Sequence, residues 1–232
     1  LARLGVGELV LIDNDIVDIT NLPRLLGAEP GDVGLPKTVP AARNARRANP
    51  DVTLTILSER VESLVAREAL RASDWIFLAA DGQAARFWVN ATVNQHLIPA
   101  TQIGVKIPIR GDGTIGIIHA INRLLLPGQG CMWCNELINP TELAVDMHPE
   151  IEREAARYLP DVPAPSVIAL NGLAAMEGLN HFMLAVTGLH TDERDGDSKV
   201  HLPLARARHD QRMRRDLNCP WCSEHGRLAR GE

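Results

Sequence analysis

Short apolar runs alternate with longer mixed segments over the first hundred residues of the chain. Runs of strand length, rich in β-forming residues, cover residues 9–12, 52–57, 75–80 and 99–105. The segments between them have helical length and cover residues 35–48, 61–72 and 83–96. Strands that alternate with helices in this way predict a parallel sheet with helical crossovers, and therefore an α/β fold.

The pattern changes after Lys106. Two apolar stretches within residues 109–120 flank Gly111-Asp112-Gly113, which is a hairpin signal and predicts antiparallel strands. Residues 131–163 are predicted to be mostly polar and irregular, with one helical patch at 150–158. A long helix is expected at 166–187, closed by Gly188. A charged loop at 191–198 and a strand at 200–207 follow. The second half of the fold is thus expected to be largely antiparallel.

Composition narrows the class of protein. The chain has 232 residues, of which 45% are hydrophobic and 23% charged, with a net charge of −5. These values describe a soluble globular protein of one or two domains, and of these two arrangements we expect a single domain over residues 1–232. The mild negative charge argues against nucleic acid as the main partner. The sequence shows no apolar run of about eighteen residues and no secretory signal, so we expect no membrane span and a cytoplasmic location.

Candidate chemistry begins where the first strand ends. The run at residues 9–12 leads into Asp13-Asn14-Asp15, and three donor side chains follow at Asn21, Arg24 and Lys37. In open α/β sheets ligands bind at the carboxyl ends of strands, where an acid commonly holds the ribose hydroxyls. Alone, each residue would be an ordinary turn acid or a solvated cation. Together, an acid for ribose and donors for phosphate indicate a nucleotide site.

The order of three short motifs resembles that of a known family. Asp13-Asn14-Asp15, Asn21-Leu22-Pro23-Arg24 and Pro36-Lys37 follow a strand in the order found in the E1-like adenylating enzymes of the ThiF/MoeB/HesA type. These enzymes activate the C-terminus of ubiquitin-like proteins. The resemblance implies a Rossmann-like, doubly wound, mostly parallel sheet with an antiparallel C-terminal half.

The resemblance also implies roles for single residues. Asp13, Asp15 and Asn21 would bind ATP, and Arg24 and Lys37 would screen its triphosphate and stabilise the departing pyrophosphate. Asp81 follows the third apolar run and matches the acid that holds Mg²⁺ in the family. An alternative for Asp81 is an N-cap of the helix that begins near Gln83. Arg86 and Asn90, one turn apart on that helix, are weaker candidates for the same cleft.

The beginning of the chain carries a further expectation. Residues 1–7 have the pattern of a helix tail with a glycine stop. In the family such a tail follows a first strand and a glycine-rich phosphate loop. We therefore expect upstream residues that supply both elements.

All four cysteines belong to two CxxC motifs, Cys131-Met132-Trp133-Cys134 and Cys219-Pro220-Trp221-Cys222, which are separated by 84 residues. Four thiolates from two such motifs suit a closed tetrahedral zinc site, and they also suit an iron–sulfur cluster. A disulfide fits a cytoplasmic protein poorly. The family resemblance favours structural Zn²⁺, which would hold the C-terminal tail on the body.

Many relatives use a further cysteine for a thioester or a persulfide. If the four cysteines bind zinc, this chain has no thiol nucleophile left. The stretch at residues 158–166 replaces the crossover loop that holds the catalytic cysteine in relatives. The chain therefore resembles an adenylate-only member, similar in chemistry to the MoeB and microcin-synthetase branches.

The expected partners follow from the same resemblance. They are a ubiquitin-like or sulfur-carrier protein ending in glycine, a second copy of the chain in a homodimer, and a JAB-type metalloprotease or E2-like protein. Two other functions stay open at this point, an NAD-dependent Rossmann oxidoreductase and a catalytically inactive E1-like scaffold. An acid after a strand would bind the ribose of NAD equally well.

Overall fold

The computed structural model describes residues 1–148 and 165–231, and the chain divides into two compact units, Leu1–Ala69 and Leu70–Glu232. We call them the N-terminal and the C-terminal unit. The predicted helical patch at 150–158 and most of the predicted crossover replacement at 158–166 lie outside the described residues.

The N-terminal unit is a parallel β-α-β arrangement. Strand β1 (Glu8–Ile12) pairs in parallel with β2 (Thr53–Leu57), and helix α1 (Thr38–Ala48) connects them. The chain opens with the short 3-10 helix η1 (Ala2–Leu4), which ends at Gly5 with φ of 82°. This left-handed backbone conformation suits glycine, so the predicted helix tail and glycine stop are confirmed.

The segment between β1 and α1 carries the predicted donors and is tied down by polar contacts. It contains two further 3-10 turns, η2 (Leu22–Arg24) and η3 (Pro30–Asp32). The buried carboxylate of Asp32 accepts hydrogen bonds from Arg43 of α1 at 2.8 Å and from the Glu29 N–H at 2.7 Å. The Arg43 guanidinium holds the pKa of Asp32 down at about 2. The loop is therefore fixed to the helix that follows it.

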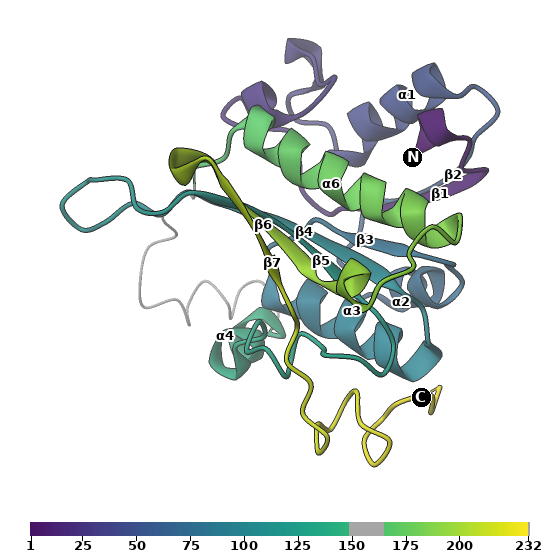
Figure 1. Cartoon of the computed structure of the whole chain (residues 1–232). Helices are drawn as coiled ribbons and strands as arrows, with labels where there is room; N and C mark the ends of the chain where they lie inside the picture. The colour runs from purple at the N-terminus through teal and green to yellow at the C-terminus, as the bar shows by residue number, and fades with distance from the viewer. Residues whose placement is uncertain (149–164, 232) are drawn as a thin grey trace. The chain divides into compact units, whose positions relative to one another are not determined.

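The C-terminal unit is built on a mixed five-stranded sheet of order β3-β4-β5-β6-β7. Strand β3 pairs in parallel with β4, and every later pair is antiparallel. The strands are Ile76–Leu78, Ala100–Lys106, His119–Leu125, Ser198–Leu202 and Ala207–Gln211. The predicted change from parallel to antiparallel strands is confirmed. Figure 1 shows helices α3 (Gln83–His96) and α6 (Ile168–Val186) on opposite faces of this sheet.

Helix α6 packs closely on β4 and β5. A Cβ on Gly178 would lie only 3.0 Å from Thr101, which shows how near the helix backbone comes to the sheet. Next to this contact, Phe182 meets Trp75 and Phe77 edge to face, with ring centroids 5.2 and 5.5 Å apart. Aromatic pairs in this arrangement contribute about 0.5–1.5 kcal/mol beyond the burial of their surface.

Several predicted boundaries of helices and strands differ from those in the structure. Helix α1 begins at Thr38 rather than at residue 35, and α2 (Leu64–Arg71) begins three residues later than predicted. In the predicted hairpin at 109–120, the N-terminal strand is reduced to an isolated bridge between Ile109 and Ile115. Strand β5 then starts at His119 and pairs with β4 instead.

Two elements were absent from the sequence-based expectations. Helix α4 (Pro140–Asp146) lies in the stretch predicted to be irregular, and Asn139 caps it by accepting the N–H groups of Thr141 and Glu142. The predicted single strand at 200–207 is two strands, because the chain turns at Pro203 before β7 begins. Strand β7 is rich in charge and lies at the sheet edge, where charged side chains reach solvent.

Candidate functional site

Asp13 lies at the carboxyl end of β1, where the sequence predicts a ribose ligand. Its Oδ1 accepts the N–H of Asp15 at 2.8 Å, so the side chain also closes a local turn. Burial raises the pKa of Asp13, although the Asp15 N–H and the charge of Lys37 act in the opposite direction. A partly desolvated carboxylate with a single hydrogen-bond donor is stabilised when hydroxyl groups donate to its remaining acceptor positions, as ribose hydroxyls do.

Asn21 and Arg24 belong to the loop that follows. Asn21 is buried, and its Oδ1 accepts the N–H of Asp18 at 3.0 Å, whereas its Nδ2 has no hydrogen-bond partner among the described residues. Arg24 donates only to the carbonyl oxygen of Thr20, at 3.3 Å, and the described part of the chain offers it no ion pair. Both side chains therefore keep donors that an anionic ligand can accept from.

Lys37 stands directly before α1 and is paired with Asp15. Its Nζ lies 2.6 Å from the Asp15 carboxylate, and its N–H donates to the Asp15 carbonyl oxygen at 2.9 Å. The Lys37 side chain is 20% exposed and that of Asp15 59%, so solvent reaches the pair mainly from the Asp15 side. A triphosphate can approach Lys37 from that side and take the place of Asp15 as its partner.

Asp81 lies in the C-terminal unit, three residues beyond the end of β3. Its side chain is exposed and has no hydrogen-bond or ion-pair partner among the described residues. The N-cap of α3 is Gly82, without a side-chain cap from its own neighbours, so the alternative interpretation of Asp81 as the N-cap is wrong. The first two N–H groups of α3 instead donate to Asp146, at 2.8 and 3.4 Å.

The four cysteines come together as predicted. The Sγ atoms of Cys131, Cys134, Cys219 and Cys222 all lie within 4.8 Å of one another, and all four residues are buried. The separations of Cys131 from Cys134 and from Cys219 are both 3.7 Å, and Cys134 lies 3.4 Å from Cys222. Tetrahedral Zn–S bonds of about 2.3 Å place sulfur atoms about 3.8 Å apart, so this donor set fits a zinc ion.

The environment differs between these thiols. Burial raises the pKa of Cys131, and it raises the pKa of Cys222 to about 12. Burial alone would also raise the pKa of Cys134, but hydrogen bonds from the Asp216 backbone and from neighbouring cysteines outweigh it, so that this pKa is lowered. Buried thiols with raised pKa values are poor nucleophiles at neutral pH, because the thiolate is the reactive form. A bound metal ion favours the deprotonated thiolates, because it displaces the protons from its ligands.

The two CxxC motifs, which we call the knuckle pair, pack on α3. Phe87 of α3 meets Trp221 edge to face at 5.2 Å, and both side chains belong to a cluster around the cysteines. Asn90 is fully buried, and its Oδ1 accepts the N–H of Met132 at 2.9 Å. Asn90 therefore orients the first knuckle, whereas the sequence pointed to the nucleotide cleft. Arg86 likewise donates to the carbonyl oxygen of Leu137, at 2.9 Å.

The C-terminal tail adds backbone contacts to this arrangement. Arg214 donates to the carbonyl oxygen of Cys134 at 2.7 Å, and a Cβ on Gly130 would collide with the backbone of Arg214 at 2.5 Å. Farther along, the N–H of Ala229 donates to the carbonyl oxygen of Asn94 at 2.8 Å, near the end of α3. Arg214 and Gly130 were not predicted, because only their spatial neighbours give them a role.

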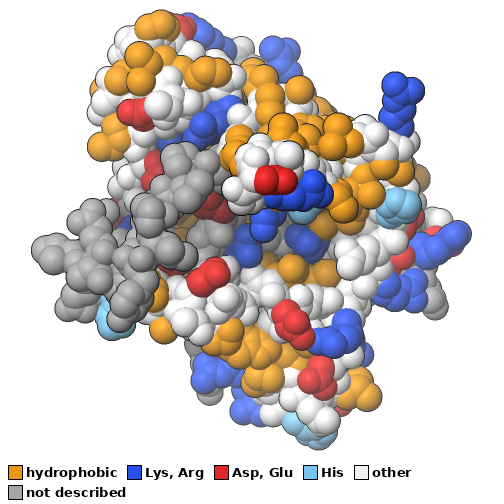
Figure 2. All heavy atoms as spheres, turned by 90° about the vertical axis from the view of Figure 1, so that its left-hand side faces the viewer, with side chains coloured by type: hydrophobic (Ala, Val, Ile, Leu, Met, Phe, Trp, Pro, Cys, Tyr) orange, Lys and Arg blue, Asp and Glu red, His pale blue; other side chains and the backbone are white. Residues whose placement is uncertain are grey.

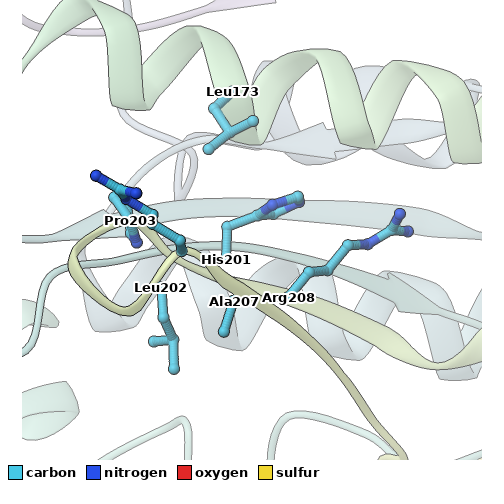
Figure 3. A pocket seen from close by; sticks show the side chains of 7 residues that line it. Leu173, His201, Leu202, Pro203, Ala207 and Arg208 are labelled. Carbon is cyan, nitrogen blue, oxygen red and sulfur yellow. The ribbon is translucent and has the colours of Figure 1, made fainter.

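A shallow pocket of about 270 Å³ lies elsewhere, between α6 and the β6–β7 turn. Figure 3 shows Leu173 above His201 and Arg208, while Leu202, Pro203, Arg206 and Ala207 complete the lining. Arg208 is paired with Glu177 at 2.7 Å, which neutralises one of the positive charges. The pocket contains none of the residues predicted to bind a nucleotide.

The surface does not present one dominant charge on the face shown in Figure 2, where basic, acidic and hydrophobic side chains are interspersed. Within residues 1–148 and 165–231, no helix has both the length and the apolar character that a membrane crossing needs.

A parallel β-α-β unit, a mixed sheet and a buried cluster of four thiols define an α/β protein of Rossmann-like type. The chain belongs to the ThiF family, because a sequence model of that family matches residues 1–191. The resemblance to the E1-like adenylating enzymes that the motifs indicated is thereby confirmed.

Two relatives illustrate the family. The SAMP-activating enzyme E1 of Haloferax volcanii is 37% identical over 114 residues, which cover 49% of this chain and 42% of that protein. The sulfur carrier protein ThiS adenylyltransferase of Escherichia coli is 34% identical over 107 residues, which cover 45% of this chain and 43% of that enzyme. The matched part therefore spans less than half the length of these relatives.

Solved structures share the fold. MccB of E. coli with ATP has a TM-score of 0.69 at 22% identity, and the match covers 96% of this chain and 61% of that one. MccB with N-formylated MccA has a TM-score of 0.73 at 20% identity, covering 96% and 62% of the two chains. The predicted α/β fold with parallel and antiparallel parts is confirmed.

Proposed function

We propose that the protein containing this chain adenylates the C-terminal carboxylate of a ubiquitin-like or sulfur-carrier protein. The observation that carries the proposal is that hydrogen-bonding groups of the N-terminal unit remain available to a ligand. Asp13 accepts only the N–H of Asp15, Arg24 donates only to the carbonyl oxygen of Thr20, and the Nδ2 of Asn21 has no acceptor among the described residues. These residues follow one another in the order of the family motifs. The names of the relatives support it, since they describe activation of SAMP and adenylation of ThiS.

Each side chain has a chemical role in this proposal. Asp13 accepts from the ribose hydroxyls, while Asn21, Arg24 and Lys37 donate to the phosphates. As the bond between the α- and β-phosphates breaks, negative charge grows on the departing pyrophosphate, and preorganised cations stabilise it. Asp15 holds Lys37 until the triphosphate replaces it. Asp81 of the C-terminal unit is proposed as the Mg²⁺ ligand on the strength of the family motif.

The donor chemistry of Asp81 fits Mg²⁺. The carboxylate is exposed and has no partner among the described residues, and Mg²⁺ needs few protein carboxylates because water and phosphate oxygens complete its shell. When bound, Mg²⁺ would neutralise phosphate charge. No protein base is needed for the reaction, because the nucleophile is already a carboxylate. It attacks the α-phosphorus, pyrophosphate leaves, and a mixed acyl-phosphate anhydride forms.

The proposal includes the absence of a thioester step on this chain. All four of its cysteines lie in the buried knuckle pair, whose geometry fits Zn²⁺. With zinc bound, the thiolates are shared with the metal and shielded by Phe87 and Trp133. The acyl-adenylate is then released to an external nucleophile, which an E2-like or JAB-type partner would supply or process.

We also propose that the protein works as a homodimer. Helix α6 packs on the sheet with Ala174, Gly178 and His181, yet Met176 is 66% and Val186 57% exposed on its outer side. A helix that is apolar around much of its circumference needs a second covering surface. Sedimentation is expected to show a dimer at micromolar concentration, and a monomer throughout that range would contradict the proposal.

The direct test is ATP–pyrophosphate exchange by the full-length protein with candidate carriers that end in glycine. Exchange that requires both Mg²⁺ and the carrier supports the proposal. A protein that binds NADH tightly and exchanges no pyrophosphate would be an oxidoreductase instead. A protein that binds the carrier but neither nucleotide would be an inactive scaffold. Both outcomes contradict adenylation.

A further inference from the structure

The N-terminus of α3 is capped from a distance. Gly82 is the N-cap, in an extended conformation with φ of −62° and ψ of 145°, and it has no side chain to offer. The carboxylate of Asp146, the last residue of α4, accepts the N–H of Gln83 at 2.8 Å and that of Ala84 at 3.4 Å. Two otherwise unpaired donors of the first helical turn are thereby satisfied.

Two more hydrogen bonds hold α4 at this place. The Gln83 side chain accepts the N–H of Asn139 at 3.1 Å and donates to Glu142 at 2.8 Å. A Cβ on Gly82 would lie 3.6 Å from the Asp146 carboxylate, so this carboxylate sits against the residue next to Asp81. The contact between α4 and the start of α3 is thus specific and multiply bonded.

Asp81 differs from other Asp and Asn residues of the chain in the hydrogen bond that it does not form. Within the described residues, seven Asp or Asn side chains accept the N–H two positions ahead of them: Asp13, Asp18, Asn49, Asp112, Asn139, Asp192 and Asp216. Asp81 stands in the same relation to the N–H of Gln83. That N–H goes to Asp146 instead, and Asp81 stays without a partner among the described residues.

We propose that Asp146 is a positioning residue that caps α3 and thereby keeps the Asp81 carboxylate available for a divalent cation. The inference rests on the proposed function, because it assigns the cation to Asp81. Without Asp146, the free N–H groups and the positive end of the helix dipole attract the nearest carboxylate. Asp81 would then close a local turn with Gln83, as its seven counterparts do, and the cation would compete with that contact.

The test measures cation binding rather than turnover. Full-length protein is titrated with Mn²⁺ in the presence of a non-cleavable ATP analogue, and free Mn²⁺ is followed by electron paramagnetic resonance. Asp146→Ala is expected to weaken Mn²⁺ binding about fivefold, which is the usual strength of one helix cap. Asp146→Asn keeps an acceptor oxygen and should bind like the wild type. Asp112→Ala removes an acid from a turn in the same unit and serves as the matched control.

A second variant restores the effect by another route. Proline has no N–H and suits the first position of a helix, and the extended conformation of Gly82 is compatible with a following proline. Adding Gln83→Pro to Asp146→Ala removes the donor that captures Asp81, so Mn²⁺ affinity should recover. Circular dichroism shows whether each variant is folded.

The outcomes separate the two proposals. Unchanged Mn²⁺ affinity in folded Asp146→Ala would overturn the positioning role and leave the proposed function intact. Equal weakening in Asp146→Asn would also overturn it, because the negative charge would then matter rather than the cap. A wild-type protein that binds neither Mn²⁺ nor the analogue would refute the proposed function and the positioning role together.

Discussion

Some residues of the N-terminal unit carry charges or hydrogen-bond donors that the fold does not fully use. Burial raises the pKa of Asp13, and Arg24 forms no ion pair among the described residues, although its charge helps to lower the pKa of Asp18. By contrast, Arg43 donates to the Asp32 carboxylate and to the carbonyl oxygen of Gly27, and these contacts hold the loop in place. The distinction between Arg24 and Arg43 separates a residue that can serve a ligand from one that serves the fold.

Substitution of the two cations proposed to bind phosphate tests their role. Arg24→Ala and Lys37→Ala should each slow carrier-dependent pyrophosphate exchange by roughly 10²–10³-fold, the usual effect of losing one preorganised donor. Arg46→Ala is the matched control, since Arg46 is an exposed arginine of the same unit, on α1. Rates within a few-fold of wild type in both variants would remove Arg24 and Lys37 from the mechanism.

The sequence was informative about residues where short motifs carry the signal. Asp13, Arg24 and Lys37 were named from their order, and the four cysteines from their spacing. Asp146 and Arg214 were missed because their partners are 62–80 residues away and no local pattern marks them. Asn90 was named for the wrong reason, because its buried contact with Met132 depends on the tertiary structure.

Elements were predictable where hydrophobic periodicity dominates. Helix α3 has the predicted bounds, whereas α4 and β7 were missed. Helix α4 is only seven residues long, too short for a clear period, and its cap at Asn139 was the one local signal. Strand β7 is an edge strand whose exposed side chains give no apolar alternation.

The interface beneath α6 is more polar than its apolar sequence suggests. His181 is 3% exposed, and its Nδ1 has no hydrogen-bond partner. Burial lowers the pKa of His181, and the charge of Lys199 adds to the effect, although Glu177 opposes it. The folded protein therefore disfavours the protonated imidazole, and protonation of His181 is expected to weaken the packing of α6 on the sheet.

This shift has a defined sign for stability. Because the folded-state pKa lies below the unfolded value of about 6.5, His181 lowers the stability of the fold as the pH falls through and below that value. The melting temperature should decline between about pH 7 and pH 5, and it should decline less in His181→Gln. The exposed His225→Gln should keep the wild-type slope. Identical slopes in all three proteins would contradict this assignment.

We propose that a zinc ion bound by the knuckle pair ties the C-terminal tail to α3, in addition to the contact between Trp221 and Phe87. Metal analysis should find about one zinc per chain. Cys219→Ser should lose it and lower the melting temperature by roughly 5–10 °C, since a few kcal/mol correspond to that change in a chain of this size. Ser223→Ala, a neighbour in the same knuckle, should keep the metal. A native protein with iron or with disulfides in place of zinc would refute the assignment.

At the scale of the whole molecule, family membership rests on residues 1–191, whereas the second knuckle lies beyond that match. The change from parallel to antiparallel strands was predictable, because the spacing between apolar runs shows where helical crossovers connect the strands and where short turns do. The organisation as a single domain stays a prediction, as does the role of each nucleotide-binding residue. Both depend on contacts between segments that no periodicity reports.

The central claim is that adenylation occurs and that no cysteine of this chain receives the acyl group. The decisive measurement incubates full-length protein, Mg-ATP and carrier, and then follows the carrier by intact-protein mass spectrometry with and without hydroxylamine. Adenylation predicts a carrier that gains one adenylyl group, the mass of AMP less one water, and becomes a hydroxamate when hydroxylamine is added, with no reductant-sensitive conjugate. A thioester mapped to Cys131, Cys134, Cys219 or Cys222 would contradict the account.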